Sequence, residues 1–105
     1  FRKGPDGKFI WPGFAENMRV LKWIVERCLG RAHAVANPLG LVPDYKDLEW
    51  KGLEEISADK FQILMSLDKE VWRQELNSHS ELFDKLKDRL PRELVARRER
   101  LQSSF

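Results

Sequence analysis

Residues 9–17 read Phe9-Ile10-Trp11-Pro12-Gly13-Phe14-Ala15-Glu16-Asn17, and a helical pattern begins directly after them. A Pro-Gly pair ends an extended segment, because proline has no N–H to donate and glycine accepts a positive φ. The stretch therefore predicts a turn that carries aromatic rings beside the start of a helix. Such a turn can hold a flat ring by stacking, or it can anchor a loop on a hydrophobic core. From the residue types alone we favour the core anchor.

The sequence before this stretch predicts a short β-ribbon over residues 1–11. Gly4-Pro5-Asp6-Gly7 is a strong turn signal, so Phe1 and Phe9 stand on opposite sides of a hairpin. A hairpin brings these two rings together, and the Pro-Gly turn folds Phe14 back towards them. Two rings of this kind can sandwich a purine base. Asn17, which has both a donor and an acceptor, could contact the edge of that base or cap the helix.

Residues 16–29 are predicted to form a helix that ends at Gly30. Its apolar stripe has i, i+3, i+4 spacing and comprises Val20, Leu21, Trp23, Ile24 and Cys28. Cys28 is the sole cysteine, which excludes an internal disulfide and is typical of a reducing compartment. We expect its thiol to be buried or half-buried.

Residues 31–56 have the least regular pattern of the chain, with turn signals at Asn37-Pro38-Leu39-Gly40. Leu39, Leu41 and Val42 are expected to pack on the core as an extended segment. Helices are predicted over residues 57–66, with Ser57 as N-cap, and over 69–89, with Asp68 as N-cap. A last helix is predicted from Pro91, in its first turn, to about Gln102.

The helix over 69–89 carries a seam of apolar and half-apolar residues at alternating spacings of four and three. The seam comprises Trp72, Leu76, His79, Phe83, Leu86 and Leu90. Such a seam could dock a partner helix. One hypothesis is therefore a non-enzymatic helical interaction module, in which the aromatic turn belongs to the core.

The predicted fold class is α+β, a mainly helical fragment with a short N-terminal β-ribbon. We expect one domain over residues 1–105. Its parts are a ribbon and aromatic turn over 1–15, a helix over 16–30, an irregular segment over 31–56 and helices over 57–105.

Composition and motifs exclude several functional classes. The net charge of +2 is too small to indicate nucleic acid, and the basic residues near the C-terminus alternate with acidic ones. No apolar run approaches the roughly 20 residues that span a bilayer. His33 and His79 lie far apart in sequence, and no metal-ligand spacing or glycine-rich phosphate loop of the GxxxxGK type occurs. We therefore expect no catalytic group and no metal ligand in this chain.

Residues 1–23 closely resemble a segment of the GTP-dependent phosphoenolpyruvate carboxykinases. The family carries Phe-Arg-Lys, a glycine-containing turn and then Phe-Leu-Trp-Pro-Gly-Phe-Gly-Glu-Asn-Ser-Arg-Val-Leu. Residues 37–43 also resemble the family, and a looser resemblance extends over the whole chain. Ala15 and Met18 depart from it, where the family has glycine and serine. If that glycine needs a positive φ, Ala15 carries a strain of about 1 kcal/mol, and Met18 adds bulk beside the pocket.

The resemblance implies that the chain is a C-terminal fragment of the α/β nucleotide-binding domain of a carboxykinase. Phe1, Phe9 and Phe14 then surround the guanine of GTP or GDP, and Asn17 contacts its edge. The intact enzyme is implied to be a cytoplasmic lyase of gluconeogenesis. It converts oxaloacetate and GTP to phosphoenolpyruvate, GDP and carbon dioxide, and uses Mn²⁺ or Mg²⁺.

The phosphate loop and metal ligands lie upstream in such proteins, so we expect the fragment to be inactive alone and to hold no cofactor. Its implied partners are the remainder of the carboxykinase chain and a guanine nucleotide, with no nucleic acid and no membrane. Part of its apolar surface is expected to face that remainder. A fragment of this kind is also expected to be capable of self-association.

Overall fold

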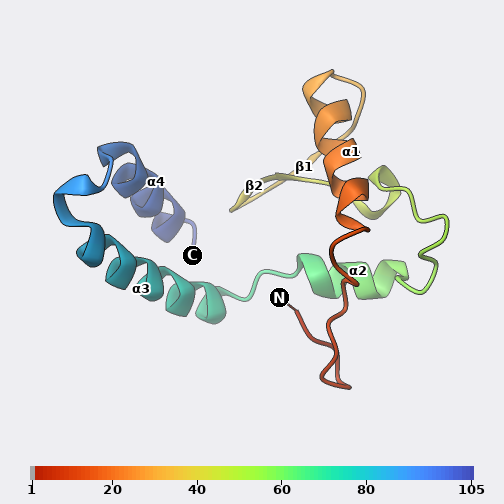
Figure 1. Ribbon diagram of the computed structural model, residues 1–105, viewed down its shortest axis with the longest axis horizontal. Helices are drawn as coiled ribbons and strands as arrows, with labels where there is room; N and C mark the ends of the chain where they lie inside the picture. The colour runs from red at the N-terminus through yellow and green to blue at the C-terminus, as the bar shows by residue number, and fades with distance from the viewer. Residues whose placement is uncertain (1) are drawn as a thin grey trace. The chain divides into compact units, whose positions relative to one another are not determined.

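The structure is a computed structural model that describes residues 2–105, and Phe1 lies outside the described residues. The chain divides into two compact units, of which the first ends at Ser66 and the second spans Leu67–Phe105. The first contains α1 (Asn17–Cys28), β1 (Val35–Asn37), β2 (Gly40–Val42), the 3-10 turn η1 (Tyr45–Asp47) and α2 (Ala58–Met65). The second contains α3 (Lys69–Leu86), the 3-10 turn η2 (Lys87–Arg89) and α4 (Arg92–Ser103) (Figure 1). The expected mainly helical fold with a short β-ribbon is confirmed.

The N-terminal hairpin forms where Gly4-Pro5-Asp6-Gly7 predicts it. Gly7 N donates to Gly4 O over 3.0 Å, and Gly7 has a φ of +75°. The arms of the hairpin share one antiparallel bridge, between Lys3 and Phe9. Backbone bonds from Gly4 N to Lys8 O and from Ile10 N to Arg2 O continue the pairing on both sides of the bridge. The described arms thus pair from Arg2 to Ile10, within the predicted span of residues 1–11.

The regular two-stranded sheet lies in the segment that was expected to be irregular. β1 and β2 pair antiparallel, with Val35 opposite Val42 and Asn37 opposite Gly40. The Asn37 side chain closes the turn by accepting from the backbone N–H groups of Leu39 and Gly40 over 2.9 and 3.2 Å. The expectation that Leu39 and Leu41 pack on the core is wrong, since they are 43% and 56% exposed. A two-stranded hairpin has no second layer to cover its faces.

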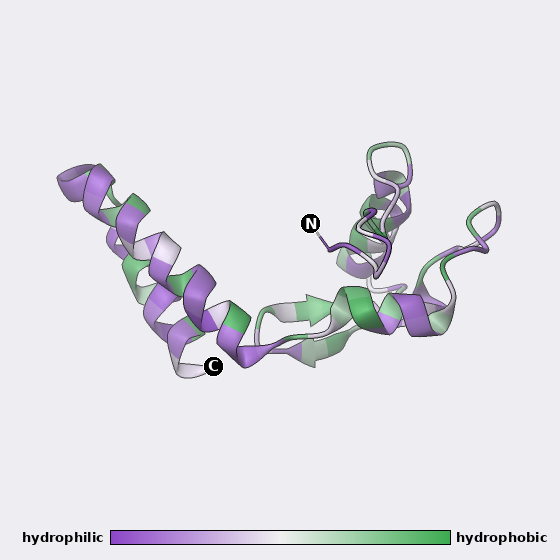
Figure 2. Ribbon diagram, turned by 90° about the horizontal axis from the view of Figure 1, so that it is seen from below, coloured by the Kyte–Doolittle hydropathy of each residue, from purple (hydrophilic) through white to green (hydrophobic). Residues whose placement is uncertain are grey.

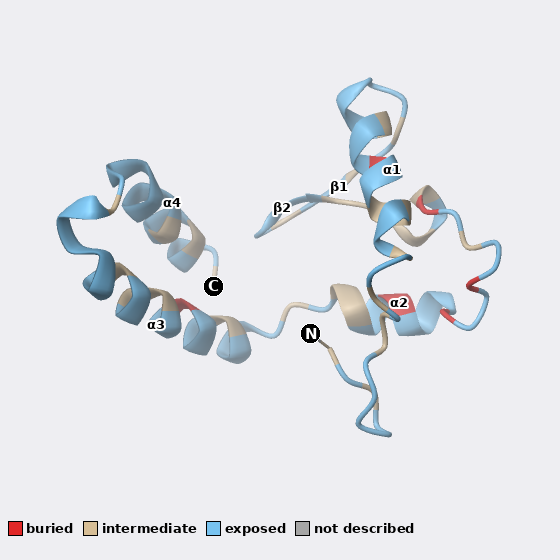
Figure 3. Cartoon of the chain, viewed as in Figure 1, coloured by how far each residue is buried: buried red, intermediate tan, exposed pale blue. Residues whose placement is uncertain are grey.

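The core of the first unit lies around the chain segment between η1 and α2. That segment contributes the buried residues Leu48, Leu53 and Ile56, α1 contributes Trp23, and α2 contributes Phe61. Rings contact one another beside them, with the centroids of Tyr45 and Trp50 stacked 4.7 Å apart. Figure 3 shows the buried positions on α1, on α2 and along the connecting loop.

α1 packs on this core mainly through its polar side. The Arg19 guanidinium donates to the carbonyls of Glu49 and Lys51 over 2.6 and 3.0 Å, and Trp23 is the buried residue of the helix. Other members of the predicted apolar stripe remain outside: Leu21 is 49% exposed and Ile24 42% exposed. The expectation of a buried or half-buried Cys28 is wrong, because its side chain is exposed.

The helix ends follow the sequence closely. Ser57 Oγ accepts from Lys60 N over 3.3 Å, and Asp68 Oδ1 accepts from the N–H groups of Glu70 and Val71 over 2.9 and 3.0 Å. α3 ends at Leu86, three residues before the predicted end, because the Lys87 backbone turns to a φ of +48°. Pro91 precedes α4 as its N-cap residue.

The second unit is a pair of helices, α3 and α4, joined at one end by a stack of two aromatic rings. Leu76 of α3 is buried, and its carbonyl accepts from the Arg98 guanidinium of α4 over 2.8 Å. Trp72 stacks on Phe105 with ring centroids 5.4 Å apart. The seam of α3 is thus partly used inside this unit, whose helices are mainly hydrophilic with separate hydrophobic segments (Figure 2).

Candidate functional site

The hairpin that carries Phe9 is bonded through Arg2 to Ser66, at the end of the first unit. The Arg2 guanidinium donates to the hydroxyl of Ser66 over 2.8 Å and also to the Ser66 carbonyl. The Phe9 side chain is 58% exposed, and Lys3 Nζ lies 5.4 Å from the centroid of its ring. Beside the hairpin is a cavity of about 480 Å³, whose lining includes Phe9, Ile10, Pro12, Lys60 and Ile63.

Trp11 connects the aromatic turn to the core and also holds Asn17. Its ring packs edge-on against Trp50, with centroids 6.4 Å apart. Its Nε1 donates to Asn17 Oδ1 over 2.8 Å. Because an indole N–H only donates, the carbonyl oxygen of the amide must face Trp11, and the NH₂ group is the part left to offer to a ligand. The N-cap of α1 is Glu16, so the Asn17 side chain does not cap the helix.

Phe14 stands at the tip of the Pro-Gly turn and is 95% exposed. The turn requires Gly13, whose φ is +98°. Ala15 is not strained, since within residues 2–105 the positive φ values outside glycine are limited to Lys87. Met18, one turn into α1, is 64% exposed. The alanine at position 15 therefore fits its place without the backbone strain considered above.

The predicted site residues are only partly brought together. Phe14 and Asn17 lie three residues apart where α1 starts, and Phe9 lines the cavity beside the hairpin, which neither of the other two lines. Phe1 was also predicted for this site and lies outside the described residues. The sequence reasoning missed Trp11, which orients Asn17. A donor-only indole six residues before an amide was the available signal.

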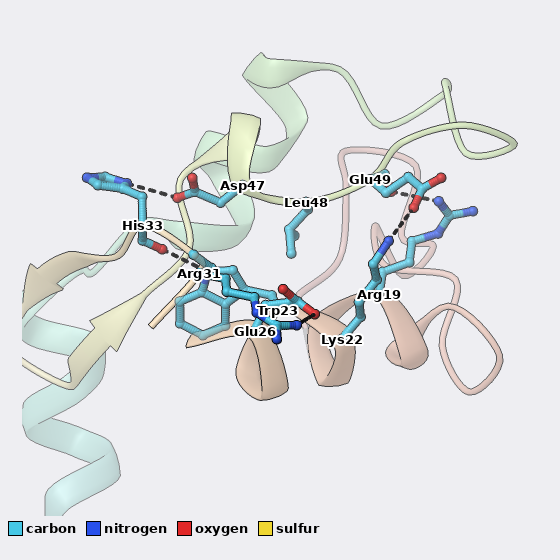
Figure 4. A pocket seen from close by; sticks show the side chains of 10 residues that line it. Arg19, Lys22, Trp23, Glu26, Arg31, His33, Asp47, Leu48 and Glu49 are labelled. Carbon is cyan, nitrogen blue, oxygen red and sulfur yellow. Dashed lines mark hydrogen bonds and ion pairs between the residues drawn. The ribbon is translucent and has the colours of Figure 1, made fainter. Parts of the chain in front are cut away.

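A second cavity of about 530 Å³ lies over Trp23 and is lined by paired charges (Figure 4). Lys22 Nζ lies 2.9 Å from Glu49 Oε2; this hydrogen bond lowers the pKa of the Glu49 carboxyl and raises that of Lys22. His33 Nδ1 lies 3.0 Å from Asp47 Oδ2, and Asp47 also accepts from Asp44 N over 2.8 Å. These polar groups satisfy one another, and the Lys22–Glu49 pair joins α1 to the loop after η1.

Asp47 is the most enclosed carboxylate of this group, with a side chain 8% exposed. Burial acts to raise the pKa of its carboxyl. The hydrogen bonds from Asp44 and His33 outweigh that effect and hold the pKa below its ordinary value. The ionised form of Asp47 is therefore part of the folded arrangement.

The described residues offer no candidate for a metal cluster or a membrane span. Residues 2–105 contain no group of three or more His, Cys, Asp or Glu placed to hold a metal ion. None of the helices in that range has both the length and the apolar character needed to cross a bilayer.

Comparison with known proteins relates the sequence of this chain to one protein family. Residues 1–104 match the family model described as phosphoenolpyruvate carboxykinase C-terminal P-loop domain. A phosphoenolpyruvate carboxykinase (GTP) of Anaeromyxobacter dehalogenans is 46% identical over 101 residues, 96% of this chain and 17% of the relative. Another, from Thermoplasma volcanium, is 42% identical over 95 residues, 90% of this chain and 15% of the relative.

The chain belongs to the GTP-dependent phosphoenolpyruvate carboxykinase family. The chain spans about 17% of the length of the Anaeromyxobacter relative.

Proposed function

We propose that this chain is the base-binding part of a GTP-dependent phosphoenolpyruvate carboxykinase. The complete enzyme converts oxaloacetate and GTP to phosphoenolpyruvate, GDP and carbon dioxide, as a cytoplasmic lyase of gluconeogenesis. Mn²⁺ or Mg²⁺ and the nucleotide phosphates are held by residues outside this chain. The chain supplies the wall that holds the guanine, through Phe1, Phe9, Phe14 and Asn17, and is inactive alone.

The observation that carries the proposal is the exposure of Phe14. A ring that is 95% exposed does not anchor a loop on a core, and in this turn Trp11 has that role instead. Exposed aromatic rings stack on nucleobases, and each such contact is worth about 1–3 kcal/mol. The position of Phe14 therefore favours ring binding over the core anchor that the residue types alone suggested.

The Asn17 amide supports a preference for guanine over adenine. Trp11 occupies its oxygen, so the NH₂ group is offered to the base. Guanine has an acceptor oxygen, O6, where adenine has an amino group, which is a second donor. A donor facing adenine at that position would leave both groups unpaired, which opposes binding.

Stacking is tested best in a chimera that is active as an enzyme. In it, this chain replaces the matching 101 residues of the Anaeromyxobacter relative. Phe14→Ala is expected to raise KM for GTP about 5- to 150-fold, from the loss of about 1–3 kcal/mol of stacking. It should change kcat little, because stacking is felt equally in the ground and transition states. Leu82→Ala, which truncates a side chain 54% exposed in α3, is the control. An unchanged KM would count against the assignment.

Base selectivity is tested with Asn17→Asp. The aspartate keeps an acceptor for Trp11 and loses the donor, so the fold is retained while the contact to the base is removed. The preference for GTP over ATP in kcat/KM is expected to fall about tenfold, the order of one base-edge contact. A variant with unchanged selectivity would exclude Asn17 from base recognition. The isolated chain should bind GTP negligibly, and a sub-micromolar Kd would contradict the assignment of the phosphate contacts to other residues.

The interaction-module hypothesis has less support. Its docking seam on α3 is partly occupied within the second unit, by the Trp72–Phe105 stack and by the burial of Leu76.

A further inference from the structure

α1 presents an apolar face that nothing in the first unit covers. Met18, Leu21, Val25 and Leu29 are 64%, 49%, 56% and 56% exposed. Their spacings of three, four and four place them along one side of the helix. Figure 3 shows most of α1 in the pale blue of exposed residues, and Trp23 is its buried residue.

This exposure results from the way the helix is seated. Trp23 is its one buried residue among those described, and the charged side next to it is bonded to the loop between η1 and α2. Arg19 reaches the carbonyls of Glu49 and Lys51, and Lys22 pairs with the Glu49 carboxylate. Rolling the helix to bury the apolar face would break these bonds, so the face stays available.

The composition of the face indicates what covers it. Four neighbouring large apolar side chains on one helix face, bordered by Lys22 whose ammonium is already paired with Glu49, fit another apolar protein surface. The family to which the chain belongs is described as a P-loop domain, yet the sequence contains no glycine-rich phosphate loop of the GxxxxGK type. The relatives are about six times longer than their matched segment, because that segment is 17% of their length. The P loop of the domain must therefore lie in the portion of those proteins that this chain does not match.

We propose that the face formed by Met18, Leu21, Val25 and Leu29 is the docking surface for the P-loop-bearing portion of the domain. This inference rests on family membership and on the exposure of α1, and it does not depend on guanine binding. It also gives α1 a double role, because the helix that starts beside Phe14 and Asn17 joins them to the part of the domain that holds phosphate. Docking would thus set the distance between the base contacts and the phosphate contacts.

Cys28 provides a direct probe of this surface. Its thiol is exposed, and it lies three residues after Val25 and seven after Leu21, on the edge of the same face. We would label the isolated chain and the chimera described above with N-ethylmaleimide, without nucleotide, and follow the Cys28 peptide by mass spectrometry. The labelling rate is expected to be at least tenfold lower in the chimera. Equal rates in the two proteins, or a chimera that does not fold, would overturn the proposal.

Paired substitutions separate docking from folding. Leu21→Glu with Val25→Glu places two charges on the face and is expected to leave the helicity of the isolated chain unchanged. In the chimera the same pair should lower the Tm and restore rapid labelling of Cys28. Gln74→Glu with Ser78→Glu adds the same charges at the same spacing on exposed positions of α3 and should do neither. A chimera that tolerates the α1 pair as well as the α3 pair would contradict docking at this face.

A second copy of the chain is the alternative occupant. It predicts that Cys28 of the isolated chain becomes protected as concentration rises, while Cys28 of a monomeric chimera stays reactive. That pair of results would overturn the proposal. An unchanged KM for GTP in Phe14→Ala would count against guanine binding but leave docking at α1 untouched, because the labelling experiment contains no nucleotide.

Discussion

The two units differ in how many aromatic rings support their buried residues. In the first unit, buried Ile56 is accompanied by three rings in mutual contact, those of Tyr45, Trp50 and Phe61. In the second unit, Leu76 is buried between two helices that are joined by a single ring stack, Trp72 on Phe105. The first unit is therefore a platform from which Phe14 can project without loss of packing. The second has little apolar area to bury, as is usual for a unit of this size. The exposed ring of Phe14 therefore costs the first unit no core contact, because Trp11 packs against the core in its place.

The largest effect is expected from Phe61→Ala, which removes a ring that is 4% exposed and contacts both Tyr45 and Trp50. It should lower the unfolding free energy of the first unit by about 3–5 kcal/mol, the usual range for truncating a buried Phe. Hydrogen exchange should show lost protection in the first unit and unchanged protection in α3 and α4. Ile63→Ala, at a position of α2 that is 48% exposed, is the control. Equal losses in both units would show that they unfold together.

Leu76→Ala tests the second unit in the same way. Leu76 is 2% exposed, but its surroundings are half-exposed and can relax, so we expect a loss of about 2–3 kcal/mol, near the lower end for buried leucines. In a unit with so little buried area this loss should unfold α3 and α4. Circular dichroism would register a fall in helicity while the signal of the aromatic core remains. Retained helicity would mean that the ring stack alone holds the pair.

Acid should weaken the first unit through Asp47. Its pKa is lowered in the folded state, so its contribution to stability is fully present above the ordinary value of about 3.9 and is lost as the pH falls through the lowered value. Asp47→Asn keeps an acceptor for Asp44 N but cannot take up the proton. We expect it to reduce stability by about 1 kcal/mol at pH 7 and to flatten the decline below pH 4. Urea midpoints between pH 7 and pH 3 would measure this, and parallel declines of both proteins would exclude Asp47 as a contributor.

Phe14→Ala should have the smallest effect on stability. A side chain that is 95% exposed contributes little to the core, so the unfolding free energy should change by less than about 0.5 kcal/mol. Together with a raised KM for GTP, this result would separate binding from packing. A loss comparable to that of Phe61→Ala would instead return Phe14 to the core-anchor interpretation.

Local signals made much of this fold predictable. The Gly4–Gly7 turn, the caps Ser57 and Asp68 and the glycine after α1 depend on a few neighbouring residues, and all appear where expected. The core between η1 and α2 was not predictable in this way. Leu48, Leu53 and Ile56 have no helical or alternating spacing, and they are buried because distant elements close over them.

The candidate site shows the same limit. Ring types and the resemblance identified Phe9, Phe14 and Asn17, but the bond from Trp11 to Asn17 depends on how the turn folds back. The sequence left open which side of α1 faces inward, because hydrophobic periodicity locates an apolar stripe without saying which molecule covers it. Arg19, bonded to two backbone carbonyls, decided which side of the helix lies inward.

The turn at Lys87 has an energetic consequence for the second unit. A φ of +48° is uncommon for a residue with a side chain, and such conformations cost of the order of 1–3 kcal/mol. The connection between α3 and α4 therefore carries a conformational cost at one end of the pair. At the other end the Trp72–Phe105 stack and the bond from Arg73 to the Phe105 carbonyl hold the two helices together. These contacts, with the bonds from Arg98 to the Leu76 carbonyl, must offset that cost for the pair to stay closed.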